Sequence, residues 1–163
     1  MVNSEINLRS FRNTDLDFVV SRQLALYETE YGFTSEIWKK YLTDGVSTFI
    51  QRFDPEKDAM FILENKSIPS GCVAVMHLDD TTAQLRFFFL EADIRGRGAG
   101  RLLMDRAVDF CREKNYGRIF LWTFSTLLAA RHLYASKGFR ITDTHMNPDW
   151  GSPVLEERWD LIL

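Results

Sequence analysis

The segment 95–101, Arg-Gly-Arg-Gly-Ala-Gly-Arg, combines residue types that could bind phosphate. It follows a strand-like run over 84–90 and precedes a helix-like run over 102–114. Glycines let the backbone approach a ligand closely. The first N–H groups of the following helix have no partner within that helix, and they carry the positive end of its dipole. These features predict a seat for phosphate groups.

Two common phosphate-binding motifs fit this segment poorly. A Walker-type loop needs Gly-Lys-Ser/Thr, and the segment supplies neither the lysine nor the hydroxyl. A dinucleotide-binding fold needs Gly-x-Gly-x-x-Gly after its first strand. Here the glycines stand at 96, 98 and 100, past the middle of the chain.

What fits is Arg-x-x-Gly-x-Gly, with Arg95, Gly98 and Gly100, followed downstream by Ala-x-x-Leu-Tyr-x-x-x-Gly-Phe over 130–139. This pair of motifs resembles the GNAT superfamily of acyl-CoA-dependent N-acyltransferases. The resemblance extends over most of the chain. It is similar to the acyltransferase half of proteins in which a MarR-type DNA-binding domain is fused to a GNAT domain, and we expect the DNA-binding half to be absent.

The resemblance implies that acetyl-CoA is the cofactor and indicates where it binds. The first motif would hold the pyrophosphate, the edge of the strand ending at Leu90 would hold the pantetheine arm, and an amide near Phe88 would polarise the acetyl carbonyl. Many GNAT domains carry an asparagine where this chain has Leu127, and Ser125 or Thr126 could substitute. The expected cofactor-binding residues are Phe88, Phe89, Leu90, Arg95, Gly96, Arg97, Gly98, Ala99, Gly100, Arg101, Ser125, Ala130 and Tyr134.

Tyr134 occupies the position from which the family's tyrosine donates to the coenzyme sulfur. A thiol with a pKa near ~8.5 leaves more easily when a phenol with a pKa of about 10 hydrogen-bonds or protonates it. A tyrosine at helical spacing is more often an ordinary amphipathic residue, but the flanking motif favours the catalytic interpretation.

The amine that attacks the thioester has to be neutral. An alkylamine of pKa ~10.4 is about one part in two thousand neutral at pH 7, which adds on the order of 4 to 5 kcal/mol to the barrier. A base or a water chain is therefore expected. Glu30 is the first candidate, with Glu36 and an ordered water behind it, although acids near helix ends are usually only solvated.

The acceptor is expected between the turn at 27–33 and the loop at 146–151, because both combine aromatic with polar residues. A small primary amine is favoured, since no acidic strip larger than Glu28, Glu30 and Glu36 is available for a polycation. The sequence does not identify the acceptor. The expected acceptor-binding residues are Tyr27, Glu30, Tyr31, Trp122 and His145, although Trp122 could be core and His145 an ordinary surface histidine.

Two other functions compete with acetyl transfer. A non-catalytic acyl-CoA-binding module could sense the cofactor or recruit a partner, but such a binder has no need of Tyr134. A nucleic-acid-binding role for the Arg-Gly repeat is disfavoured by the net charge of −3 and a pI of about 5.6. The expected partner is thus a small-molecule amine, with neither nucleic acid nor membrane, and a homodimer is left open.

The elements needed to position these residues form one domain over 1–163. The periodicity predicts the order β-α-α-β-β-β-α-β-α-β-β, a mixed sheet with helices on both faces. The resemblance implies that this is the GNAT fold, with a mostly antiparallel central sheet. Gly45 is expected to break or kink the second helix, Ser125 or Thr126 to cap the fourth, and 66–71 to form a hairpin turn.

Cysteine usage and the N-terminus bear on the cellular compartment. Cys72 and Cys111 have neither metal-ligand spacing nor a disulfide pattern, so no metal is expected and both read as core thiols. No run of residues approaches ~20 apolar positions, and the start of the sequence lacks a signal-peptide pattern. The default expectation is the reducing cytoplasm.

Overall fold

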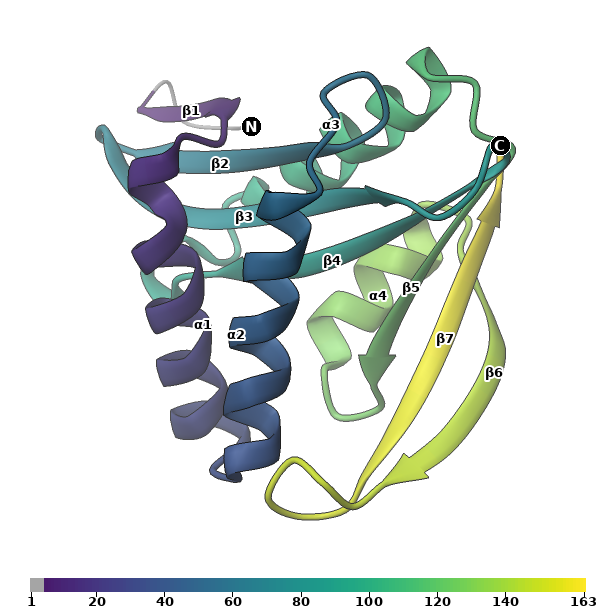
Figure 1. The fold of residues 1–163 in the computed structure, drawn as a ribbon. Coiled ribbons are helices and arrows are strands. Elements are labelled where there is room, and N and C mark those ends of the chain that lie inside the picture. The colour runs from purple at the N-terminus through teal and green to yellow at the C-terminus, as the bar shows by residue number, and fades with distance from the viewer. Residues whose placement is uncertain (1–4) are drawn as a thin grey trace.

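The structure, a computed structural model, describes residues 5–163 as a seven-stranded sheet with helices on both faces (Figure 1). The predicted order of elements is confirmed. Along the chain these are β1 (Ile6–Ser10), α1 (Leu16–Tyr31), α2 (Glu36–Gln51), β2 (Ala59–Asn65), β3 (Ile68–His77), β4 (Thr82–Leu90), α3 (Ala99–Glu113), β5 (Arg118–Phe124), α4 (Leu128–Ser136), β6 (Arg140–Asn147) and β7 (Val154–Ile162), with short 3-10 turns at Asn13–Asp15 and Ala92–Ile94.

The strands lie in the order β1-β2-β3-β4-β5-β7-β6, and every neighbouring pair is antiparallel except β4 and β5. That parallel pair is short. Its ladder runs only from Thr82 to Gln84 on β4 and from Arg118 to Phe120 on β5. Beyond these residues, within the described chain, the two strands do not pair, so the sheet opens between them.

Two hydrophobic cores cover the two faces of the sheet. Leu103, Met104 and Ala107 of α3 pack in one core together with Tyr134 of α4. The other core lies under α1 and α2, which run side by side across the opposite face (Figure 1). Alternate residues of β2 enter the two cores, so this strand is apolar on both faces, as strands covered on both sides are.

A β-bulge interrupts β4 immediately before the end of the strand. Ala74 pairs with Arg86 and Cys72 pairs with Phe89, so two residues of β4 oppose the single residue between them on β3. Phe87 has a φ of 56°, and its carbonyl accepts a hydrogen bond of 2.9 Å from the Cys72 thiol. The extra residue moves the Phe87 side chain onto the face that Arg86 already occupies, the α1–α2 face.

Three local predictions were wrong. Gly45 does not break α2, which continues to Gln51. The glycine serves close packing instead, because a Cβ there would lie 2.9 Å from the Arg86 guanidinium. The hairpin turn is only Lys66-Ser67, both at positive φ, and β3 already begins at Ile68.

The predicted cap of α4 is the third error. Leu127 is the N-cap, without a side-chain hydrogen bond, and neither Ser125 nor Thr126 takes this role.

Both cysteines are buried free thiols, as expected. Within residues 5–163 no helix is long and apolar enough to cross a membrane.

Candidate active site

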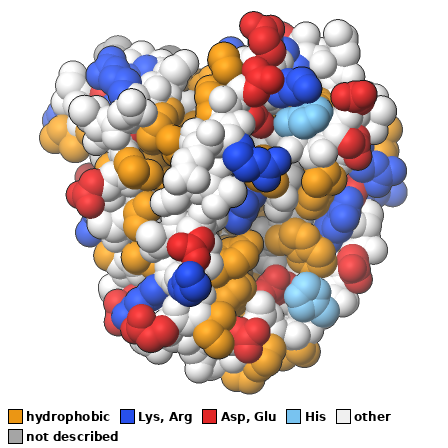
Figure 2. All heavy atoms as spheres, in the orientation of Figure 1, with side chains coloured by type: hydrophobic (Ala, Val, Ile, Leu, Met, Phe, Trp, Pro, Cys, Tyr) orange, Lys and Arg blue, Asp and Glu red, His pale blue; other side chains and the backbone are white. Residues whose placement is uncertain are grey.

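A cavity of about 470 Å³ opens where β4 and β5 diverge. Its walls come from α1, α2, β4, the glycine-rich segment, β5 and α4. On the molecular surface, hydrophobic side chains gather in a hollow between α2 and β7 (Figure 2). Most of the residues singled out from the sequence meet in this cavity: Tyr27, Tyr31, Phe88, Phe89, Leu90, Arg95, Gly96, Gly98, Ala99, Gly100, Arg101, Trp122, Ala130 and Tyr134.

The glycine-rich segment ends the cavity on one side and leads directly into α3. Gly96 and Gly98 have φ values of 74° and 80°, which side chains rarely adopt. The hydrogen bonds of the helix start with the Leu102 N–H, which donates to the Gly98 carbonyl. Within the described chain, the N–H groups of 96–101 have no protein acceptor, so they are available to an anion.

Arg95 lines the cavity and is held by contacts within the protein. Its guanidinium binds both carboxylate oxygens of Glu30, at 2.5 and 2.8 Å, and also donates to the Leu90 carbonyl at 3.1 and 2.9 Å. Its main-chain N–H donates to Ala92. Arg95 therefore ties the end of α1 to the end of β4, and its side chain holds the segment in place.

The two candidate bases, Glu30 and Glu36, each form an ion pair with a basic side chain. Accepting a proton from an amine would compete with the bidentate pair between Glu30 and Arg95, and Glu30 does not line the cavity. Glu36 is 90% exposed, 3.4 Å from Lys39, and also outside the lining.

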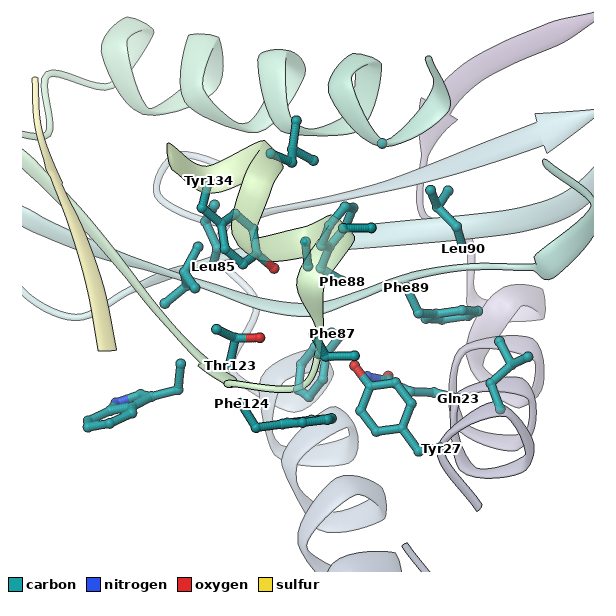
Figure 3. A pocket seen from close by; sticks show the side chains of 18 of the residues that line it. Gln23, Tyr27, Leu85, Phe87, Phe88, Phe89, Leu90, Thr123, Phe124 and Tyr134 are labelled. Atoms are coloured by element: carbon teal, nitrogen blue, oxygen red, sulfur yellow. The ribbon is translucent and has the colours of Figure 1, made fainter. Parts of the chain in front are cut away.

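Tyr134 reaches the cavity from α4. Its ring packs against Phe88, Phe139 and Trp159, with centroids 6.0 to 6.3 Å apart. The hydroxyl forms no hydrogen bond to another described residue, and Figure 3 shows it turned into the cavity. Burial raises the pKa of Tyr134 well above its ordinary value, so the phenol keeps its proton and is able to donate a hydrogen bond.

Further polar groups face Tyr134 across the cavity. Gln23 and Tyr27 come from α1 and Thr123 from β5, and Figure 3 shows their polar atoms directed toward the space between them. Gln23 hydrogen-bonds the Tyr27 hydroxyl, and burial raises the pKa of that phenol. Gln23 Oε1 and Thr123 Oγ1 are buried without a partner within residues 5–163. Buried polar atoms are nearly always paired, so these atoms indicate a place for a ligand or water.

The end of the cavity toward α2 is aromatic. Tyr27 stacks on Trp38 at 5.3 Å, Tyr31 meets Phe124 at 5.2 Å, and Trp150 lies 5.3 Å from Trp38. Trp150 comes from the loop between β6 and β7, and its indole N–H donates to Glu156, which also lines the cavity. The loop thus closes this end of the cavity.

Some predicted residues lie outside the lining, and others were missed. Arg97 and Ser125 do not line the cavity, whereas Thr126 does. His145 is 50% exposed and contacts Trp122 with ring centroids 5.0 Å apart. Trp150 belongs to the loop 146–151 that was expected beside the acceptor, whereas six further lining residues were not predicted: Gln23, Trp38, Tyr41, Arg86, Thr123 and Phe124. Their positions depend on long-range packing, and the motifs carry no signal for them.

Comparison with known proteins gives the same motifs a family context. The model described as "Acetyltransferase (GNAT) family" matches residues 23–139. N-acetylaspartate synthetase of Danio rerio is 37% identical over 62 residues, which cover 38% of this chain and 22% of that protein. Streptothricin acetyltransferase A of Bacillus subtilis is 24% identical over 85% of this chain and 83% of its own. Several curated relatives are matched over half of their length or less.

Solved structures share the fold over nearly the whole chain. One is yncA from Salmonella typhimurium, solved with its cofactor acetyl-CoA. It superposes with a TM-score of 0.78 at 15% identity, over 98% of this chain and 95% of that one. At this identity the likeness establishes the fold alone, and any inference about the reaction has to come from the sequence motifs and the residues of the site.

Proposed function

Because this chain belongs to the acetyltransferase (GNAT) family, we propose that it transfers the acetyl group of acetyl-CoA to a primary amine of a small acceptor. The observation that carries this proposal is the position of the Tyr134 hydroxyl. It is a buried, protonated donor without a protein partner, and it lies in the same cavity as the unpaired N–H groups of 96–101.

The residues present fit acetyl-CoA. The free N–H groups of 96–101, with Arg101 beside them, would bind the pyrophosphate. The edge of β4 that faces β5 has no ladder partner after Gln84. Apart from the Leu90 carbonyl, which accepts from Arg95, its peptide groups are free to bind the amides of the pantetheine arm as an added strand would. Acetyl-CoA supplies the acetyl group as a thioester.

The residues of the chain support direct transfer to the amine. Tyr134 would donate to the departing sulfur, and an amide of β4 near Phe88 would polarise the carbonyl. A cysteine relay is disfavoured, because burial raises the pKa of Cys111 to about 12 and that of Cys72 well above the ordinary value. With Glu30 paired to Arg95, we propose that water held by Gln23 and Thr123 takes the proton of the amine, and Glu30 is the alternative base.

The main alternative is a non-catalytic acyl-CoA sensor or recruitment module. Tyr134 and the unpartnered polar atoms opposite it favour the enzyme, since a sensor requires neither. Incubating the protein with acetyl-CoA and a panel of small amines, and measuring thiol release, separates the two functions. Amine-dependent thiol release supports the transferase, and binding of acetyl-CoA without release from any amine would support the sensor.

Three finer assignments belong to the same proposal. The specific similarity to the acyltransferase half of MarR-GNAT fusions is based on the segments 27–33, 85–100 and 121–123. A cytoplasmic location is supported by two free cysteines. A homodimer is consistent with β6, an edge strand of the sheet that is exposed along almost its whole length.

A further inference from the structure

We infer that the acceptor carries an anionic group in addition to its amine, and that Arg86 of β4 binds this group. The inference rests on the proposed acetyl transfer and adds the class of acceptor, a small amino carboxylate. It assigns a ligand group to the α2 end of the cavity, which the sequence motifs leave unassigned.

Arg86 is a cation held in place without a carboxylate. Its guanidinium lies over the rings of Phe87 and Tyr41, at 4.6 and 5.7 Å, and Nη2 is 3.4 Å from the Tyr41 hydroxyl. Within residues 5–163 it forms no ion pair, and it lines the cavity. The other arginines of the lining have roles already, because Arg95 pairs with Glu30 and Arg101 lies at the glycine-rich segment.

A second donor lines the same cavity as Arg86. Trp38 is 5% exposed, and within the described chain its indole N–H has no hydrogen-bond acceptor. The ring of Trp38 stacks on that of Tyr41, with centroids 6.1 Å apart, and the Arg86 guanidinium lies over the same Tyr41 ring. An unpartnered buried donor costs free energy that a ligand oxygen would recover. A carboxylate between Arg86 and Trp38 would satisfy both groups.

The amine end of the acceptor has its own unpartnered atoms. Gln23 is 4% exposed and Thr123 is 6% exposed, and both present a free oxygen that can accept a hydrogen bond from the amine or from the water that takes its proton. Arg86 precedes Phe88 by two residues of β4, so the anionic and reactive ends lie near each other on the same strand. Aromatic rings surround the space between them, which favours an apolar body.

Matched pairs of amines test this inference. Each pair consists of an amino acid and its decarboxylated amine, namely phenylalanine with phenethylamine, tryptophan with tryptamine and leucine with isoamylamine, and β-alanine and γ-aminobutyrate vary the spacing. We expect kcat/KM for at least one amino carboxylate to be about tenfold or more above that of its decarboxylated amine or, for β-alanine and γ-aminobutyrate, above that of the simple amines. Arg86→Met should lower kcat/KM for that carboxylate by ~10- to 150-fold, the range for hydrogen bonds to charged groups, and leave the uncharged partner within about threefold.

Arg52→Met is the matched control. Arg52 lies next to α2, is exposed and does not line this cavity, so its loss should change neither member of a pair. Arg86→Lys, which keeps the charge, should retain part of the preference. Acetylation of the simple amines with no advantage for any carboxylate would overturn the inference and leave the proposed transferase standing.

A binding measurement covers the case in which no amine is acetylated. That result would refute the proposed transferase, and the same compounds are then tested for thermal stabilisation of the protein saturated with coenzyme A. Stabilisation by an amino carboxylate, lost in Arg86→Met and kept in Arg52→Met, supports the anion site. Absence of stabilisation by every carboxylate overturns it.

Discussion

Replacing Gly96 with valine should remove cofactor binding at a known cost in stability. Gly96 has a φ of +74°, and a Cβ built on it meets no atom within 4 Å. The variant therefore suffers backbone strain without a clash. Left-handed backbone costs an ordinary residue about 1–2 kcal/mol. For a chain of this size, each kcal/mol lowers Tm by roughly 2–4 °C, so Tm should fall by roughly 2–8 °C.

The cofactor effect is large enough to be resolved above this loss. Acetyl-CoA at a hundred times its Kd adds about 2.7 kcal/mol to the stability of the native state, or roughly 5–11 °C in Tm. In Gly96→Val the side chain projects from the phosphate seat and the N–H groups of 96–101 lose their arrangement. The variant should melt as a folded protein but show no shift with acetyl-CoA in a thermal melt.

Gly32 provides a control with the same strain. Its φ is +70°, a Cβ there also meets no atom within 4 Å, and it ends α1 outside the cavity lining. Gly32→Val should lose a similar amount of Tm and keep the full shift with acetyl-CoA. A full shift in Gly96→Val, or an equal loss of the shift in both variants, would refute the assignment of 96–101 as the phosphate seat.

Three other changes test separate parts of the reasoning. Tyr134→Phe should lower kcat by ~10²- to 10⁴-fold with little change in the Kd of acetyl-CoA, and turnover within about threefold, with chemistry rate-limiting, would mean that another group protonates the sulfur. Glu30→Gln should keep kcat within about threefold, since glutamine still accepts from Arg95; a loss of ~10²-fold or more would instead identify Glu30 as the base. Burial opposes the charge of Asp160, but hydrogen bonds from Arg158, Thr142 and Arg118 hold its pKa at about 2. Because this pKa is lowered, Asp160 stabilises the fold above its unfolded pKa of about 3.9. As the pH falls from 5 to 2, the free energy of unfolding measured in urea should fall by about 2 kcal/mol more in the wild type than in Asp160→Asn, and an equal fall in both proteins would contradict this assignment.

The parts of the fold that follow from local patterns could be predicted from the sequence. The bounds of α1 and β4 and the capping of α2 by Ser35 depend on periodicity and on residues adjacent in the chain. Gly45 was misread because the reason for it is Arg86, distant in sequence. A glycine such as Gly45 in a helical pattern indicates a break only when no side chain from a neighbouring strand packs against the helix at that position.

The candidate site divides along the same line. The proposed phosphate seat and Tyr134 belong to motifs, so their residue types and spacing were sufficient to single them out. The pair between Arg95 and Glu30 joins residues 65 positions apart, and no local pattern announces it. Gln23 and Arg86 were missed for a further reason, since each is an ordinary polar residue of its element until packing places it in an aromatic cavity.

The bulge at Phe87 divides β4 into two halves, and the alternation of side chains between the two faces of the sheet shifts by one residue from the first half to the second. In the first half, Leu85 faces α3, and without the extra residue Phe87 would do the same. Deleting one residue there would restore strict alternation, return Arg86 and Phe87 to opposite faces, and let a straight strand continue alongside β5. The opening in the sheet thus depends on one extra residue in β4. Insertions or deletions of one residue in 85–89 should therefore be far more damaging than most substitutions there.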